Sequence, residues 1–92
     1  MRVWCNGFLL EDPHAPALRT DDHGLTVGDG VFETVRAYDG VPFAPTRHHR
    51  RLVRSGAGLG LPVPPAEEIA AAVAAVLEAN ALGDARIRIT VT

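Results

Sequence analysis

The eight residues 31–38 limit the folds open to this chain more than any other segment. They read Val-Phe-Glu-Thr-Val-Arg-Ala-Tyr, so two sets of side chains alternate along the stretch. A period of two is typical of a β-strand, whose side chains point in turn to its two faces. Gly28-Asp29-Gly30 predicts a tight turn before the strand, and Asp39-Gly40 predicts a hairpin that returns through Val41 to Phe43. The chain is therefore expected to form an antiparallel sheet around this segment.

Turn signals place further strands at both ends of the chain. Asn6-Gly7 separates two short extended stretches, Arg2 to Cys5 and Phe8 to Leu10, and predicts a hairpin. Glu11 to Asp22 is rich in Pro, Asp and His and is interpreted as a connecting loop. Near the other end, Arg86 to Thr92 alternates charged or polar with apolar residues, which predicts a last strand.

Two helices are predicted between these strands. Pro45 is suited to the first turn of a helix, and Gly58 and Gly60 are expected to end it. The spacing predicts that one face of this helix carries His48, Arg51, Leu52, Ser55 and Leu59.

Glu67 and Glu68 open the second helix, where the helix dipole favours negative charge. Its expected buried side carries Ile69, Val73, Val76, Leu77 and Asn80. The strands and helices are segregated along the chain, which indicates an α+β fold. The prediction is a small antiparallel sheet of three strands, then two helices, then a further strand.

Composition excludes several classes of protein. Ninety-two residues suffice for one small domain, and a net charge of −2 argues against nucleic-acid or membrane-surface binding. No apolar run approaches the roughly 20 residues of a membrane span, and the first residues lack the apolar stretch of a signal peptide. The single Cys5 cannot form an internal disulfide. We therefore expect a cytoplasmic protein.

The basic helix holds the first candidate site residue, Arg51. Its neighbours Arg47, Arg50 and Arg54 are interpreted as a solvated face. Arg51 shares a face with Leu52, so it is expected to point toward whatever the helix packs on. A guanidinium there can donate two parallel hydrogen bonds to phosphate, or it can form a structural ion pair. Spacing alone favours the ion pair.

Other candidate motifs are weaker. Gly28-Asp29-Gly30 lacks the third glycine and the following helix of a dinucleotide fingerprint. The four histidines show no metal-ligand spacing, so no metal site is predicted. Cys5 is expected to lie in the core rather than to act as a nucleophile.

A longer combination of motifs resembles a known family. The run Asp22 to Arg36 contains Gly-Asp-Gly-Val-Phe-Glu-Thr, and it is followed by Gly40, Pro42-Phe43, His48, Arg51-Leu52 and Ser55. This ordered set resembles the class IV aminotransferases, which are the fold-type IV pyridoxal-phosphate enzymes. The resemblance implies that residues 1–92 are the N-terminal small domain of such an enzyme, with pyridoxal 5′-phosphate as cofactor, a small-molecule substrate and a homodimer as the assembly.

The resemblance also implies roles for three residues. Arg51 of the His-x-x-Arg-Leu helix would contact the cofactor phosphate, which reverses the preference from spacing alone. Phe32 would line the substrate pocket, and Arg88 would face a substrate carboxylate. All nine basic residues of the chain are arginines, so the lysine that would bind the cofactor covalently is absent. We expect this lysine in a second domain beyond Thr92, so that the chain is the first part of a longer enzyme.

The Gly-Asp-Gly-Val-Phe-Glu-Thr run is most similar to the 4-amino-4-deoxychorismate lyase branch of the family. Branched-chain enzymes usually have Tyr at Val27 and Gly at Thr34, and D-amino acid enzymes usually have Tyr at Phe32. Such a lyase eliminates pyruvate to leave 4-aminobenzoate for folate synthesis. A branched-chain or D-amino acid transaminase is the first alternative. A stand-alone domain without catalytic activity is the second, because the chain alone lacks the lysine.

Overall fold

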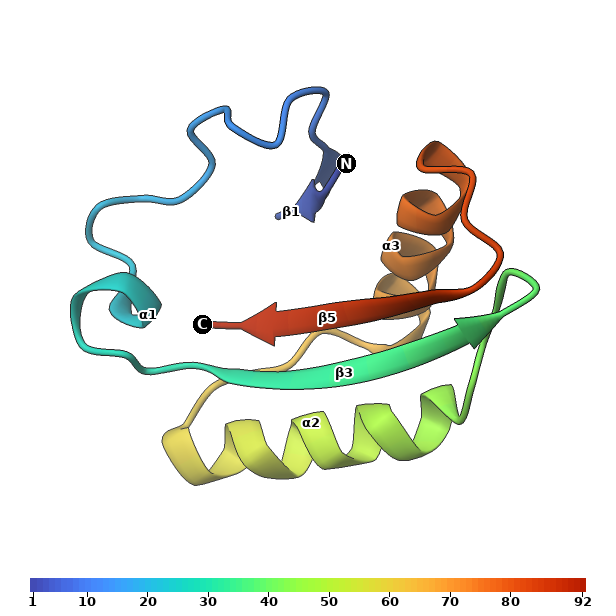
Figure 1. Ribbon diagram of the computed structural model, residues 1–92. Helices are drawn as coiled ribbons and strands as arrows, with labels where there is room; N and C mark the ends of the chain where they lie inside the picture. The colour runs from blue at the N-terminus through green and yellow to red at the C-terminus, as the bar shows by residue number, and fades with distance from the viewer.

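The computed structural model describes all residues from Met1 to Thr92. Four strands and one short helix precede two long helices, and a last strand follows them (Figure 1). The elements in chain order are β1 (Trp4–Cys5), β2 (Phe8–Leu9), α1 (His23–Thr26), β3 (Val31–Tyr38), β4 (Val41–Pro42), α2 (Pro45–Leu59), α3 (Ala66–Ala79) and β5 (Ala85–Val91). The α+β class predicted from the segregated pattern is confirmed.

The central sheet has the strand order β4-β3-β5, and both of its pairings are antiparallel. β5 pairs with β3 along the whole strand, from Val31 opposite Val91 to Ala37 opposite Ala85. Four strands rather than the predicted three precede the two long helices, and β1 and β2 form a separate two-stranded ribbon. The last strand of the chain is therefore one of the three that make up the central sheet.

One face of the sheet is covered by helices and the other is bare. On β3, Glu33, Val35 and Ala37 are buried, and the residues between them are exposed. Ala37 packs with Val73 and Leu77 of α3, and α2 runs along the length of β3 (Figure 1). The strict alternation of β3 therefore separates a helix-covered face from a face that is open to solvent.

The buried row of α2 differs from the predicted face. Leu52 is 1% exposed and Gly56 is also buried, whereas Ser55 and Leu59 are exposed. The helix α2 is therefore rotated about its axis relative to the prediction. A close contact explains this rotation, because a Cβ on Gly56 would lie 2.8 Å from both the Leu61 carbonyl oxygen and Val63 Cγ2. Only a glycine lets the chain after the helix pass this near, so the row His48, Leu52, Gly56 faces inward.

The predicted ends of both helices agree largely with the structure. Pro45 stands in the first turn of α2, and Gly60 caps its end with φ of 69°, a left-handed conformation that suits glycine. Gly58 lies inside the helix rather than at its end. In α3, Val73 and Leu77 are buried as predicted.

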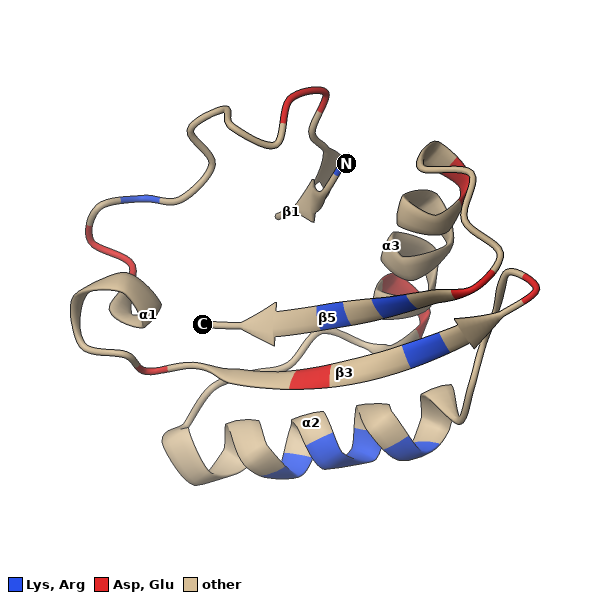
Figure 2. Ribbon diagram, viewed as in Figure 1, with Lys and Arg blue, Asp and Glu red and all other residues tan.

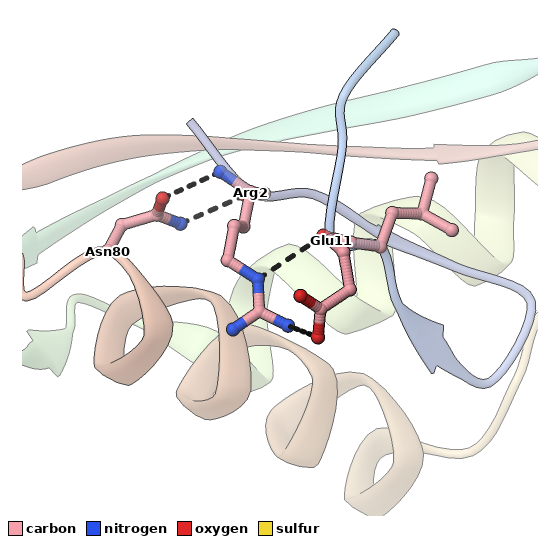
Figure 3. A network of polar contacts seen from close by, with 4 residues as sticks. Arg2, Glu11 and Asn80 are labelled. Carbon is pink, nitrogen blue, oxygen red and sulfur yellow. Dashed lines mark hydrogen bonds and ion pairs between the residues drawn. The ribbon is translucent and has the colours of Figure 1, made fainter. Parts of the chain in front are cut away.

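Contacts between residues distant in sequence hold the N-terminal part in place. The Asn80 amide accepts a hydrogen bond from the Arg2 N–H at 2.7 Å and donates one to the Arg2 carbonyl at 2.9 Å (Figure 3). Asp22 caps α1 by accepting from the Gly24 N–H at 2.8 Å, and it also accepts from the Thr92 hydroxyl at 2.9 Å. The helix α1 was not predicted; it has only four residues, and its capping residue Asp22 also contacts the end of the chain.

Candidate functional site

Arg51 stands beside an acidic residue of the sheet. Its Nε lies 3.6 Å from Glu33 Oε1, and the same oxygen lies 2.8 Å from His48 Nδ1. The side chain of Arg51 is 59% exposed, while that of Glu33 is 8% exposed. The ion pair that the spacing favoured is therefore present, but the guanidinium is more exposed than a residue facing the core would be.

Glu33 lies on the helix-covered face because β3 alternates. It is directly opposite Ile89 of β5 and shares its face with Val35 and Ala37. A carboxylate placed among apolar side chains needs a hydrogen-bond partner, since an unpaired buried charge is costly. His48 provides that partner from the first turn of α2, one helical turn before Arg51 and Leu52.

The other arginines of α2 belong to an outer surface. Arg47, Arg50 and Arg54 are exposed. Figure 2 shows several basic segments on α2, below the acidic segment of β3, and further basic segments on β3 and β5. Arg51 thus differs from its neighbours in having an acidic partner on the sheet.

Phe32 and Arg88 meet on the bare face of the sheet. The Arg88 guanidinium carbon lies 3.9 Å from the centre of the Phe32 ring, a cation–π contact between β5 and β3. Phe32 is 53% exposed, and Arg88 Nε donates to the Thr90 hydroxyl at 3.4 Å. Two residues predicted separately as substrate contacts are therefore neighbours, and both are open to solvent.

The three predicted site residues do not form one cluster within this chain. Phe32 and Glu33 are adjacent in β3 and point to opposite faces, so the Phe32–Arg88 pair is on one side of the sheet and Arg51 is on the other. A site that used all three residues would have to pass around the edge or end of the sheet.

A cleft of about 480 Å³ opens between α2 and α3 on the helix-covered side. Glu33 and His48 lie in its wall, together with apolar residues of both helices. None of Arg51, Phe32 and Arg88 lines it. This cleft therefore does not coincide with the predicted cofactor and substrate contacts.

Two participants were not identified as site residues from the sequence. Glu33 was assigned to the strand and His48 to a helix face, and both belong to the family motif, but neither was given a role. A signal did exist, because Glu33 is the one charged residue among the inward positions of β3, and a buried charge requires a partner.

The remaining polar groups give no second site. No three His, Cys, Asp or Glu side chains are placed to hold a metal ion. Cys5 is half-buried rather than in the core, with Sγ 3.9 Å from the Ala17 carbonyl oxygen. In the first loop the Arg19 guanidinium, bound to Asp21 through two contacts of 2.8 Å, lowers the pKa of that carboxyl. None of the helices is both long and apolar enough to cross a membrane.

Comparison with known proteins identifies the family. Residues 30–92 match the family described as amino-transferase class IV. The match includes Glu33, His48 and Arg51 as well as the Phe32–Arg88 pair. The chain belongs to the class IV aminotransferase family, and the predicted resemblance is confirmed.

Two curated relatives cover nearly the whole chain. The protein named "Putative branched-chain-amino-acid aminotransferase" of Methanocaldococcus jannaschii is 42% identical over 93 residues, which is 100% of this chain and 32% of that protein. D-alanine aminotransferase of Staphylococcus haemolyticus is 33% identical over 92 residues, which is 99% of this chain and 32% of that protein. The chain thus spans about a third of the length of these relatives.

Two solved structures have the same fold in one of their parts. The fold IV-transaminase CpuTA1 from Curtobacterium pusillum superposes with a TM-score of 0.69 and 40% identity, covering 90% of this chain and 29% of that one. The "Putative 4-amino-4-deoxychorismate lyase" from Legionella pneumophila gives 0.75 and 26% identity, covering 88% and 30%. The fold is that of the N-terminal domain of fold-type IV enzymes.

Proposed function

We propose that residues 1–92 form the N-terminal small domain of a pyridoxal-phosphate-dependent transaminase. The proposal places the cofactor-binding lysine in a second domain outside this sequence, because the chain contains no lysine. Support comes from the family match and from relatives named as branched-chain and D-alanine aminotransferases. In such enzymes the cofactor acts as an electron sink for bonds at the α-carbon of the amino acid.

The exposed guanidinium of Arg51 is the observation that carries this proposal. A guanidinium suits phosphate because two of its N–H groups can donate parallel hydrogen bonds. Arg51 can do so, since 59% of its side chain is exposed and its ion pair with Glu33 is made through Nε at 3.6 Å. The two terminal nitrogens of the guanidinium are then available to bind the cofactor phosphate.

Phe32 and Arg88 are proposed as substrate contacts. An arginine stacked on an aromatic ring presents a fixed positive charge beside an apolar surface. That pairing suits the carboxylate and the apolar side chain of an amino acid. In this arrangement Arg88 orients the substrate through its carboxylate, and Phe32 excludes water from one side of it.

The bare face of the sheet supports a larger assembly. Phe32, Tyr38, Val41 and Phe43 are each more than half exposed, and Tyr38 and Phe43 contact each other edge to face. Exposed apolar surface of this kind marks a contact with other protein. We infer that the second domain and the second subunit of a cytoplasmic homodimer cover this face.

A lyase is the second candidate. The structural neighbour from Legionella pneumophila has the higher TM-score of the two described, and its name is that of a 4-amino-4-deoxychorismate lyase. The Gly28-to-Thr34 run favoured the same reaction, with pyruvate and 4-aminobenzoate for folate synthesis as products. Both candidates use the same cofactor and would use Arg51 in the same way.

One experiment tests both candidates in the complete protein that contains this domain. The protein, loaded with pyridoxal phosphate, is incubated with a branched-chain amino acid or D-alanine plus 2-oxoglutarate, and separately with 4-amino-4-deoxychorismate alone. Transamination predicts amino-group transfer in the first mixtures only. Release of pyruvate and 4-aminobenzoate from the second mixture alone would instead identify the lyase, and turnover in neither would contradict both.

A further inference from the structure

We infer that Glu33, held by His48, is a positioning residue that directs the guanidinium of Arg51 toward an anion. The inference rests on the proposed function, because the anion is the phosphate of pyridoxal phosphate. It adds to that function two residues of β3 and α2 that are not themselves expected to touch the cofactor.

Glu33 is the fixed end of this arrangement. Its side chain is 8% exposed, lies on the helix-covered face of the central strand β3, and is bound at 2.8 Å by His48 Nδ1. His48 is itself only 19% exposed. A carboxylate confined by a strand on one side and a helix on the other cannot follow the motion of a solvent-exposed partner, so Arg51 must adjust to Glu33.

The contact decides which edge of the guanidinium is free. Glu33 Oε1 lies 3.6 Å from Nε of Arg51, so the ion pair is made at the inner nitrogen of the guanidinium. The outer edge between the two terminal nitrogens is left to donate two parallel hydrogen bonds to one phosphate. An arginine loses much rotamer freedom when it is fixed, and Glu33 has already restricted it before the anion binds.

A carboxylate near an anion-binding arginine also has an opposing effect, because it repels the anion. Two features of the structure reduce this repulsion. The guanidinium lies between Glu33 and the anion, and the outer part of Arg51 is in solvent, where charges are screened within about 10 Å. His48 additionally donates to the same carboxylate oxygen. We therefore expect the orienting effect to exceed the repulsion.

The test is a double-mutant cycle on the complete protein. The dissociation constant of pyridoxal phosphate is measured by equilibrium dialysis, and phosphate binding is followed by the ³¹P chemical shift, for the wild type, Glu33→Gln, Arg51→Ala and the double variant. Gln retains an acceptor for His48 but removes the charge that attracts Arg51. We expect Glu33→Gln to weaken binding about fivefold, equivalent to about 1 kcal/mol, and to have no further effect once Arg51 is Ala.

A matched control and a stability measurement separate a positioning role from a structural one. Glu67→Gln removes an acidic residue that also lines the cleft and should leave binding unchanged. If Glu33→Gln weakens binding equally with and without Arg51, or leaves it the same or tighter, the positioning role is wrong. If Arg51→Ala itself has no effect on binding, the proposed phosphate contact fails instead, so the two failures are distinguishable. Thermal unfolding of each variant shows whether a lost affinity reflects a lost fold.

Discussion

The helix α2 and its cap contain three glycines, Gly56, Gly58 and Gly60, and substitutions at the first two test how this helix packs. Replacing Gly56 by Ala places a Cβ 2.8 Å from the Leu61 carbonyl oxygen and from Val63 Cγ2. The backbone at Leu61 is hydrogen-bonded to the helix, since the Leu61 N–H donates to the Gly56 carbonyl oxygen at 2.8 Å. The segment after the helix must therefore move and strain or break this hydrogen bond.

Two opposing effects determine the magnitude. Ala is favoured over Gly inside a helix by about 1 kcal/mol. Overpacking costs about 1–3 kcal/mol, and loss of a hydrogen bond adds about 1 kcal/mol. We expect Gly56→Ala to lower the free energy of unfolding by a net of about 1–3 kcal/mol. Gly58→Ala in the same helix meets nothing within 4 Å, and should raise the free energy of unfolding by about 1 kcal/mol.

Urea unfolding followed by circular dichroism at the helix band measures both variants. With a dependence on urea of about 1 kcal/mol per molar for a chain of this size, the midpoint should fall by about 1–3 M for Gly56→Ala and rise by about 1 M for Gly58→Ala. Because the depth of α2 also sets the distance between Arg51 and Glu33, Gly56→Ala should additionally weaken phosphate binding. If both substitutions shift the midpoint in the same direction, the assignment of Gly56 as the contact that orients α2 is refuted.

Three further predictions concern the cofactor and the N-terminal ribbon. In the complete protein, Arg51→Ala should weaken pyridoxal phosphate binding by about tenfold or more, the loss expected for a charge-assisted phosphate contact. Arg50→Ala should change this binding little. Equal losses of affinity for the two variants in equilibrium dialysis would contradict the prediction. Asn80→Ala removes three hydrogen bonds, so hydrogen exchange should accelerate at the Arg2 and Leu10 amides by about tenfold or more and remain unchanged in β3. Borohydride reduction of the 92-residue chain with pyridoxal phosphate should modify only the amino group of Met1, and mass spectrometry that finds a modified internal residue would refute this.

Local patterns determined most of the elements of this protein. The alternation of residues 31–38 and the Asp39-Gly40 turn predict the β3–β4 hairpin, because both signals act between neighbouring residues. Pro45 and the glycine at position 60 similarly mark the two ends of α2. The four-residue helix α1 was not predicted. Its capping residue Asp22 also accepts a hydrogen bond from Thr92, which is far away in the sequence.

The candidate site divides in the same way. The sequence by itself singled out Arg51 as a guanidinium with either a phosphate or an acidic partner, since its residue type and family motif are local. Only the tertiary structure decided that the acidic partner is Glu33, because that contact depends on the rotation of α2 against β3. The rotation follows from the close passage of Leu61 and Val63 over Gly56, a packing contact that no periodicity in the sequence records.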